Sequence, residues 1–471
     1  MISLAKRKAI DTTEGPIFSK MVAFVIPLVL TNLIQQLYTV ADNMVVGKFS
    51  SNSAALGGIG SAGSIIAFLT ALFASFAVGT AAVISHDFGK RDDDALSKGV
   101  HTSLIISLIV GSAVGLFGFV FANPILVMLN TKAEFLDTAT LYMQIRCIGM
   151  PFVALYNSAA ATLRSVGDSR SPLYILTFSG LANVLLNLLF VIGFGMSADG
   201  VAYATLVSQI LSIAFALWIL MKRKSENYCV RLSFLKIDKK SAKRILKFAI
   251  PGTIQGSVAS VMNVFLSSAG NIFSGEVIET RTVSNNIDTI LSTVLSTYTH
   301  VALTFTGQNR GAGKLDRAKK ALFCSMLQAF VVAVVFGQLI LLCRKPLISM
   351  FVDSSIYDLS KITEYATVIM SIMLTSYTLT CLTTNLSGFI KGMGYSIPSM
   401  VISLVDVLVV RTTWIFGLFP SVRTLEFLYF VYPISWAFSG ICYCTVAFVV
   451  WKMEKKKFLL KQTELASKVN T

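Results

Sequence analysis

Long apolar stretches separated by short polar connections make up most of this chain. A helix needs about twenty apolar residues to cross roughly 30 Å of hydrocarbon. The predicted spans are 17–41, 55–85, 101–122, 135–163, 172–195, 198–221, 245–270, 278–307, 320–343, 359–390, 398–420 and 425–451. The pattern predicts an all-α integral membrane protein of about 12 transmembrane helices, with eleven or thirteen as alternatives.

Composition agrees with a chain surrounded by lipid, because 54% of the 471 residues are apolar and only 14% are charged. Soluble domains carry roughly 25% charged residues. The net charge is +16, but the basic residues stand in short tracts between apolar runs rather than on one basic face. This distribution argues against a nucleic-acid partner. The seven cysteines form no metal-binding spacing and are interpreted as packing residues.

The positions of the basic residues along the chain predict which ends of the spans face the cytoplasm. If the N-terminus is cytoplasmic, 31 of the 40 Lys and Arg residues fall on the cytoplasmic side and six fall in outer loops. Cytoplasmic loops carry such an excess. We therefore expect a multi-pass protein of a prokaryotic cytoplasmic (inner) membrane, in contact with lipid, with both termini in the cytoplasm.

Local patterns recur after 222 to 226 residues, which predicts two similar halves. The recurring pairs are Pro27 with Pro251, Ser85–Ala95 with Gln308–Ala318, and Leu163–Pro172 with Phe389–Pro398. Six spans separate the repeats, so both halves have the same orientation, as in transporters that rock two lobes about a central site. The predicted domains are an N-terminal lobe 1–221, a basic cytoplasmic linker 222–244, a C-terminal lobe 245–451 and a cytoplasmic tail 452–471.

Polar residues form one stripe along the first span. Thr31, Gln35, Tyr38 and Asp42 are spaced by three or four residues and so share a helix face. Polar groups facing lipid are costly, so this face is predicted to point into protein or a wet cavity. Asp42 is either a coupling-ion carboxylate, binding H⁺ or Na⁺, or an interfacial residue that ends the helix.

Several motifs together resemble the multidrug and toxic compound extrusion (MATE) family. The resemblance rests on the loop Thr306–Lys320, on the segment Leu163–Pro172, on Thr31–Tyr38 and on Val431–Trp436. It covers nearly the whole chain in the expected order, and it is specific as a set. It implies two six-helix bundles and the export of mostly cationic organic compounds in exchange for Na⁺ or H⁺.

The resemblance also implies a coupling-ion site in the N-terminal half. Ion-coupled members often have an aspartate where this chain has Asn187, and an amide cannot titrate. Asp42 is then the one ionisable member of the predicted site, which otherwise comprises Gln35, Asn157, Asn183, Asn187 and Thr205. The alternative is that these amides only hold helices together.

The eighth span carries a second polar stripe that suggests a cavity wall. Asp288 fits an acidic position of the family, although Asn286 stands where an arginine usually does. The alternative is a buried ion pair between Asp288 and Arg281. The predicted substrate cavity comprises Tyr38, Gln255, Asn285, Asp288 and Ser292. A structural role is predicted for the intramembrane charges Asp406, Arg411 and Arg146.

No phosphate-binding loop, HExxH motif or nucleophile elbow occurs in the chain, so we predict neither an enzyme nor direct use of ATP. We expect no catalytic residue, no metal apart from Na⁺ at Asp42, and no cofactor besides the coupling ion. The predicted function is a monomeric secondary transporter that exports small amphipathic cations by alternating access. The alternatives are a flippase for a lipid-linked sugar and a membrane sensor or scaffold without transport.

Overall fold

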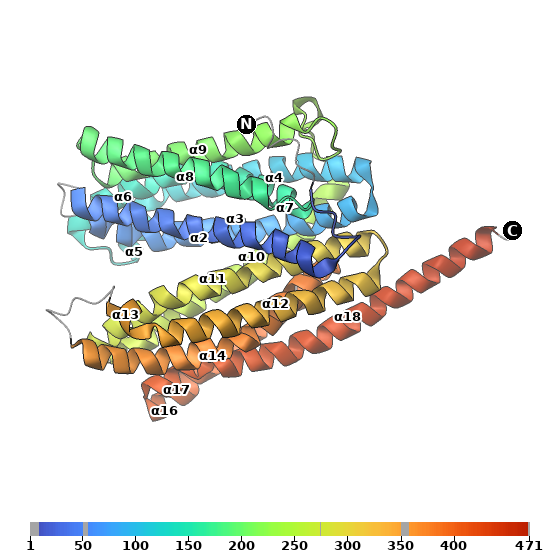
Figure 1. Cartoon of the computed structure of the whole chain (residues 1–471). Coiled ribbons are helices and arrows are strands. Elements are labelled where there is room, and N and C mark those ends of the chain that lie inside the picture. The colour runs from blue at the N-terminus through green and yellow to red at the C-terminus, as the bar shows by residue number, and fades with distance from the viewer. Residues whose placement is uncertain (1–8, 50–54, 274, 350–357, 470–471) are drawn as a thin grey trace. The chain divides into compact units, whose positions relative to one another are not determined.

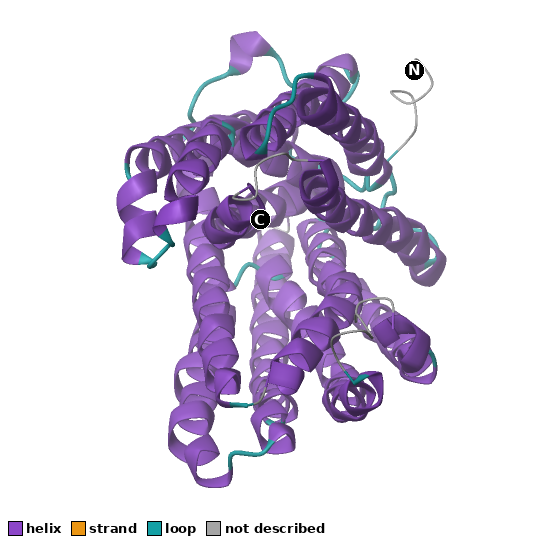
Figure 2. Cartoon of the chain, turned by 90° about the vertical axis from the view of Figure 1, so that its left-hand side faces the viewer, coloured by secondary structure: helices purple, strands orange, loops and turns teal. Residues whose placement is uncertain are grey.

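The computed structural model describes residues 9–49, 55–273, 275–349 and 358–469. Within these residues the chain consists of helices and loops, with no strand (Figure 2). Ten of the described helices are long and apolar enough to cross a membrane. The predicted all-α class is therefore confirmed.

Two compact units can be distinguished from the contacts within the chain. Unit 1 comprises Met1–Asp11 and Ile26–Thr253, and unit 2 comprises Thr12–Val25 and Ile254–Thr471. Helix α2 (Ile17–Phe49) begins in unit 2 and enters unit 1 next to Pro27. Helix α10 (Lys239–Ala269) begins in unit 1 and enters unit 2 next to Pro251. Each unit therefore contains the start of the helix that continues into the other.

Unit 1 is built mainly from helices that follow one another closely (Figure 1). They are α3 (Ala55–Lys90), α4 (Asp93–Val120), α5 (Ala122–Met128), α6 (Ala133–Ile148), α7 (Met150–Ser165), α8 (Arg170–Leu188) with the π-helical turn Leu189–Gly193, α9 (Ala198–Lys222) and the 3₁₀ turn Leu232–Phe234. Gly111 and Gly115 of α4 stand against α6 and α7, where a Cβ would meet backbone atoms of Pro151 and Cys147 at 2.9 and 2.6 Å. Small residues permit this close packing between membrane helices.

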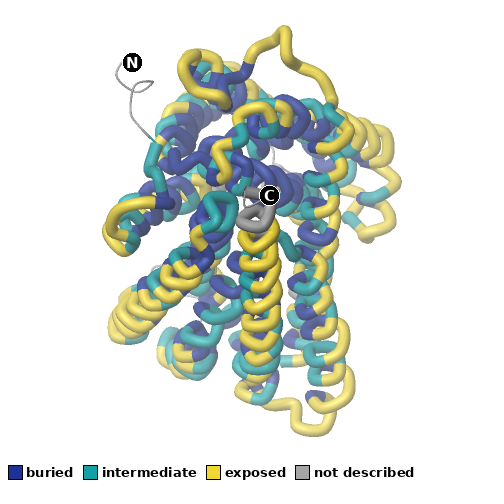
Figure 3. Tube along the Cα trace, turned by 90° about the vertical axis from the view of Figure 1, so that its right-hand side faces the viewer, coloured by how far each residue is buried: buried dark blue, intermediate teal, exposed yellow. Residues whose placement is uncertain are grey.

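Unit 2 combines four long helices with several short helical segments (Figure 1). They are the 3₁₀ turn Gly270–Ile272, α11 (Gly275–Gly311), α12 (Leu315–Leu342), α13 (Arg344–Ser349), α14 (Leu359–Gly392), α15 (Ser396–Val405), the π-helical turns Asp406–Arg411 and Thr413–Leu418, α16 (Phe419–Val422), α17 (Leu425–Tyr429) and α18 (Val431–Val469). Residues of α18 beyond Trp451 are mostly exposed (Figure 3).

Two predicted spans are not among the ten long apolar helices, and each has a physical reason. Span 135–163 is divided into α6 and α7 at Gly149, just before Pro151. Span 278–307 lies in α11, whose 37 residues form one continuous helix with many Thr, Ser and Asn side chains. Every predicted span therefore coincides with helix in the structure.

Corresponding helices in the two units end in similar turns, each with a glycine in the left-handed region. Gly167 follows α7 with φ +92°, and Gly394 follows α14 with φ +89°. This left-handed region favours glycine. A Cβ on Gly167 would also lie 2.2 Å from the carbonyl oxygen of Ile10, so that position excludes any side chain.

The start of α10 is held inside unit 1 by the ends of α3 and α4. Arg244 donates two hydrogen bonds to the buried carboxylate of Asp87, at 2.8 and 2.6 Å. The backbone N–H of Asp238 donates to the Thr102 hydroxyl at 3.0 Å. The N–H of Ser241 donates to the Asp238 carboxylate at 2.8 Å, and hydrogen bonds from the Ser241 side chain and backbone hold the pKa of Asp238 below its ordinary value.

The segment before α2 is held inside unit 2 by the connection between α11 and α12. Thr12 donates its hydroxyl to Gln308 Oε1 at 2.6 Å. Arg317 donates to the carbonyl oxygens of Thr12, Glu14 and Gly15 at 3.1, 2.7 and 2.7 Å. The connection between α11 and α12 is part of the segment Gln308–Ala318, which repeats the pattern of Ser85–Ala95 in the sequence. In unit 1 the repeated segment therefore binds the start of α10, and in unit 2 it binds the residues before α2.

Candidate coupling and substrate sites

Asp42 lies within hydrogen-bonding distance of α8 in unit 1. The Asn187 amide Nδ2 donates to Asp42 Oδ1 at 2.5 Å and is also 3.3 Å from Asn183 Oδ1. Asn183 and Asn187 are 4% and 0% exposed. The structure therefore brings together three of the residues that the sequence analysis assigned to the coupling-ion site.

The two buried amides keep unused hydrogen-bonding atoms. Asn187 Oδ1 and Asn183 Nδ2 have no hydrogen-bond partner among the described residues. Buried polar atoms are nearly always satisfied by protein, water or a ligand. A carboxylate beside a free amide oxygen offers the hard oxygen donors that small cations prefer.

The other predicted members make local hydrogen bonds. Asn157 donates to the Val153 carbonyl at 2.9 Å, and Thr205 donates to the Val201 carbonyl at 2.8 Å, each within its own helix. Gln35 is exposed on α2. Their participation in an ion site stays a prediction.

Tyr38, predicted in the substrate cavity, lies one turn before Asp42 on α2. Its hydroxyl donates to the Leu176 carbonyl of α8 at 2.5 Å. Gly180 of the same helix leaves room for the phenol ring, because a Cβ there would overlap the ring at 1.5 Å. Tyr38 and Asp42 therefore both connect α2 to α8.

Arg146, for which a structural role was predicted, lies on α6. Arg146 Nε is buried and has no hydrogen-bond partner in the described part of the chain.

Asp288 of α11 is bound by a residue that the sequence analysis did not select. Tyr377 of α14 donates its hydroxyl to Asp288 Oδ1 at 2.5 Å. Tyr377 is buried, and the Ser292 hydroxyl is a further hydrogen-bonding neighbour. Ser292 and Asp288, both predicted in the substrate cavity, therefore meet the same tyrosine.

Aromatic rings continue from Tyr377 into α18. The ring of Tyr377 stacks on Trp436 with centroids 5.4 Å apart, and Trp436 lies 5.2 Å from Tyr432. Tyr432 in turn stacks on Tyr429 at 6.1 Å. These four rings, the aromatic column, begin at the hydroxyl that binds Asp288. An anion beside aromatic faces is suited to cations.

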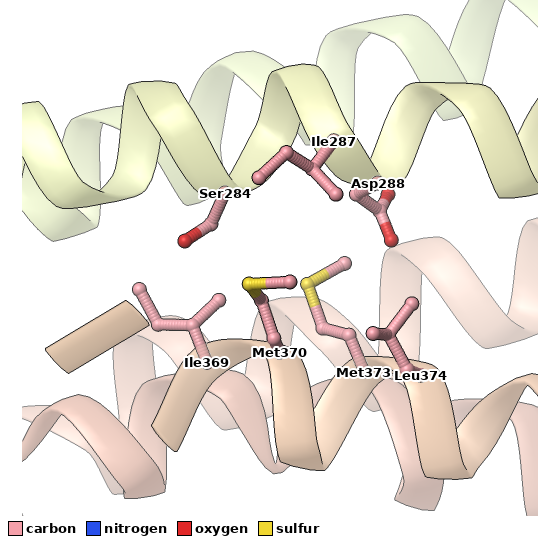
Figure 4. Close-up of a pocket in the computed structure, with 7 residues that line it drawn as sticks. All are labelled: Ser284, Ile287, Asp288, Ile369, Met370, Met373 and Leu374. Carbon is pink, nitrogen blue, oxygen red and sulfur yellow. The ribbon is translucent and has the colours of Figure 1, made fainter. Parts of the chain in front are cut away.

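A narrow pocket between α11 and α14 reaches Asp288. It is lined by Ser284, Ile287, Asp288, Ile369, Met370, Met373 and Leu374. Figure 4 shows the thioether groups of Met370 and Met373 standing opposite Ile287 and Asp288. Methionine adapts to ligands of different shape. The pocket therefore combines one carboxylate with a deformable apolar wall.

The remaining predicted cavity residues have other surroundings. Gln255 lies beside the Tyr443 hydroxyl, and its Oε1 has no hydrogen-bond partner among the described residues. Asn285 is exposed on α11. Arg281 donates to the carbonyl oxygens of Ser267 and Leu266 at 3.3 and 3.4 Å. Arg281 thus donates hydrogen bonds to backbone carbonyls, whereas Asp288 accepts a hydrogen bond from Tyr377.

Asp406 and Arg411 lie together, as the sequence analysis considered. Ser435 donates to Asp406 at 2.7 Å, and Arg411 Nε donates to the Ser435 hydroxyl at 2.8 Å. The guanidinium Nε is 3.5 Å from the carboxylate. The two charges are thus joined through a serine at a π-helical turn.

Comparisons with known proteins agree with this architecture. The family model MatE matches residues 27–189 and 276–413. The chain is 26% identical over 311 residues to the probable multidrug resistance protein YpnP of Bacillus subtilis, covering 66% of this chain and 69% of that protein. It is 24% identical over 352 residues to YoeA of the same species, a probable multidrug resistance protein, covering 72% and 74%.

A crystal structure of a MATE protein in complex with MaD3S is similar over 96% of this chain and 99% of that one. The TM-score is 0.87 at 20% identity. This similarity supports the fold of twelve transmembrane helices, and the family consists of transporters rather than enzymes. The chain therefore belongs to the MATE family of membrane transporters.

Proposed function

We propose that this protein is a secondary active transporter that exports organic cations in exchange for H⁺ or Na⁺ by alternating access. The observation that carries the proposal is the meeting of Asp288, Tyr377 and Trp436 in unit 2. A carboxylate attracts a cation in a cavity of low dielectric, and aromatic faces add cation–π attraction. The names of YpnP and YoeA as probable multidrug resistance proteins support the same class of substrate.

The coupling ion is assigned to unit 1. Asp42 supplies the negative charge, and Asn187 and Asn183 supply buried amide groups beside it. Ion and substrate do not need to share a site, because exchange requires only that they favour different conformations. Binding of the ion at Asp42 shifts the protein toward a state with lower substrate affinity.

The proposal includes a place in the cell. The excess of basic residues in the predicted cytoplasmic segments supports termini in the cytoplasm and helices in the inner membrane of a prokaryotic cell. One chain contains both lobes, so a monomer is sufficient. The partners are a small-molecule substrate and membrane lipid.

The test is efflux of ethidium from cells that express the protein, under imposed pH and Na⁺ gradients. Wild type should transport with one gradient, and Asp42→Asn should lose gradient-driven efflux. Asp137→Asn is the matched control, because Asp137 is exposed at the start of α6. Undiminished gradient-driven efflux by Asp42→Asn would contradict the role of Asp42. Absence of ethidium efflux from well-expressed wild type would favour the flippase or a non-transport role.

A further inference from the structure

Five lysines, called the basic patch, lie where α12 begins and where α18 leaves its predicted span. The predicted spans are 320–343 and 425–451, so these side chains stand at the polar edge of the apolar stretches. Both helix segments belong to unit 2. Four of the lysines are exposed, and the fifth, Lys455, has 44% of its side chain exposed. The basic patch consists of Lys319 and Lys320 of α12 and Lys452, Lys455 and Lys456 of α18.

Trp451 of α18 brings lysines of the two helices together. The Lys319 ammonium lies over its ring, 4.6 Å from the centroid, and the Lys455 ammonium lies 5.0 Å from the same centroid. The two ammonium groups are therefore no farther apart than the sum of these distances. Lys452 lies over the ring of Phe448 at 4.3 Å. Such cation–π contacts hold flexible lysine side chains near one place.

Two acids of these helix ends leave most of the positive charge unbalanced. Asp316 Oδ1 is 3.7 Å from Lys455 Nζ, and an exposed pair of this kind contributes little. Glu454 is buried and is bound by residues outside the basic patch, because Arg310 Nε donates to it at 2.9 Å and Lys457 Nζ at 3.2 Å. The basic patch therefore has five positive charges against one aspartate.

The corresponding helix ends of unit 1 have a different charge. By the repeat, α4 and α9 correspond to α12 and α18. Lys222 lies over Trp218 at 5.5 Å, which repeats the contact of a lysine with a tryptophan at the end of a span. Helix α4, however, begins with acids, and Asp94 accepts a hydrogen bond from Lys98 at 2.6 Å. The similar helix order of the two units therefore does not by itself explain the basic patch.

Apolar rings are exposed directly beside the basic patch. Phe323 follows Lys319 by one turn of α12, and Phe448 precedes Lys452 by one turn of α18. Both rings are 57% exposed and lie farther inside the predicted spans than the lysines. A cationic surface above exposed aromatic rings at the edge of a span matches a phospholipid, whose phosphate lies above its acyl chains. A soluble acidic partner would use only the charges.

We propose that the basic patch binds the headgroup phosphate of an anionic phospholipid. The inference rests on the proposed function, which has membrane lipid as a partner, and it names the class of lipid. Basic clusters immediately beside a membrane span are attracted to anionic lipids. The ammonium groups of Lys319 and Lys455 contact the phosphate, and Phe323 and Phe448 contact the acyl chains.

Native mass spectrometry of the full chain in detergent measures the binding of phosphatidylglycerol and of phosphatidylcholine with the same acyl chains. Wild type should bind phosphatidylglycerol about tenfold more tightly. The double variant Lys319→Gln/Lys455→Gln should lose about tenfold or more of this affinity, because each lysine near a charged lipid surface contributes roughly fivefold. The matched control is Lys98→Gln/Lys222→Gln, which removes the same charge from the corresponding helix ends of unit 1. The control should change the affinity less than about twofold, because its charges lie outside the basic patch.

Equal binding of the two lipids by wild type would overturn the inference, even if no variant were recovered. Equal losses in the two double variants would also overturn it, because binding would then depend on net charge alone. Displacement of phosphatidylglycerol by an equal concentration of glycerol phosphate would have the same meaning, since the basic patch would then bind a soluble anion. None of these results affects the proposed export, which is tested separately by gradient-driven efflux of ethidium.

Discussion

Asp42 in unit 1 and Asp288 in unit 2 both lie within a polar stripe on a long helix, but their neighbours differ in kind. Asp42 accepts a hydrogen bond from Asn187, whose amide also lies 3.3 Å from Asn183 Oδ1. Asp288 accepts a hydrogen bond from Tyr377, whose ring begins the aromatic column. A carboxylate beside amides is suited to a small cation, whereas rings and methionines are suited to a large organic one.

The same residue type can therefore serve two tasks in one fold, because the side chains around each aspartate differ. The repeat in the sequence makes the halves similar in helix order and turns. The chemistry of each half depends on a few side chains, such as Asn187 in one and Trp436 in the other. If the two carboxylates have separate tasks, substitutions at the two positions should have different effects.

The largest expected effect is on substrate binding by Asp288→Asn. The dissociation constant of ethidium should rise about tenfold or more, because a charge pair near a protein surface contributes on the order of several kcal/mol at 4 Å. Asp42→Asn should change the same constant less than about threefold, since its partner is the coupling ion. Fluorescence polarisation on purified protein measures both. Equal losses in the two variants would mean that the carboxylates share a task.

A second acid at position 187 should change the pH dependence of gradient-driven efflux. In Asn187→Asp two carboxylates stand within hydrogen-bonding distance, and like charges so close retain a proton between them. The pH of half-maximal efflux should therefore rise by about one unit or more. Asn123→Asp is the control, since it adds the same charge at an exposed position of α5. A profile unchanged in Asn187→Asp would place position 187 outside the coupling site.

The two tyrosine hydroxyls should differ in what they contribute to stability. Tyr377→Phe removes a hydrogen bond to a carboxylate and should lower the free energy of unfolding by about 1.5–3 kcal/mol. Tyr38→Phe removes a hydrogen bond to the Leu176 carbonyl and should cost about 0.5–1.5 kcal/mol. Unfolding in mixed micelles, followed by circular dichroism, measures the difference. A larger loss of unfolding free energy in Tyr38→Phe than in Tyr377→Phe would contradict this prediction. The stronger hydrogen bond would then be that of Tyr38 in unit 1.

The smallest expected effect concerns ring recognition in unit 2. Trp436→Leu should weaken ethidium binding by about threefold, the effect of one exposed cation–π contact. Binding of tetraethylammonium, which has no ring to stack, should change less. Trp414→Leu is the matched control, because Trp414 stacks on Phe427 outside the aromatic column. Equal effects of the two tryptophan changes on ethidium would remove Trp436 from the substrate site.

Much of the fold follows from local patterns in the sequence. Apolar runs of membrane-spanning length need no tertiary information, and all twelve predicted spans coincide with helix. The boundary between units does not follow from such patterns. The chain enters the other unit inside helices α2 and α10, next to Pro27 and Pro251, whereas a sequence reading looks for boundaries in polar loops. The predicted linker role of 222–244 stays a prediction.

The candidate sites could be predicted in part. Asp42, Asn183 and Asn187 stood out because polar residues are rare in spans and recur at helical spacing. Tyr377 and Trp436 were not assigned to a site, although Trp436 ends the motif Val431–Trp436, because aromatic residues are common in membrane helices. Their meeting depends on how α14 and α18 pack. The acidic position of Asp288 indicated the site, but the chain has no local signal for the tyrosine that binds it.

The reciprocal binding of starting segments has a consequence for the ancestry of the protein. Residues Thr12–Val25 complete unit 2, and the start of α10 completes unit 1. A protein made of one such half could obtain the corresponding segment from a second copy, as domain-swapped dimers do. Joining two copies into one chain turns that exchange into a permanent one. Each half of this chain thus depends on the other half for the start of one of its long helices.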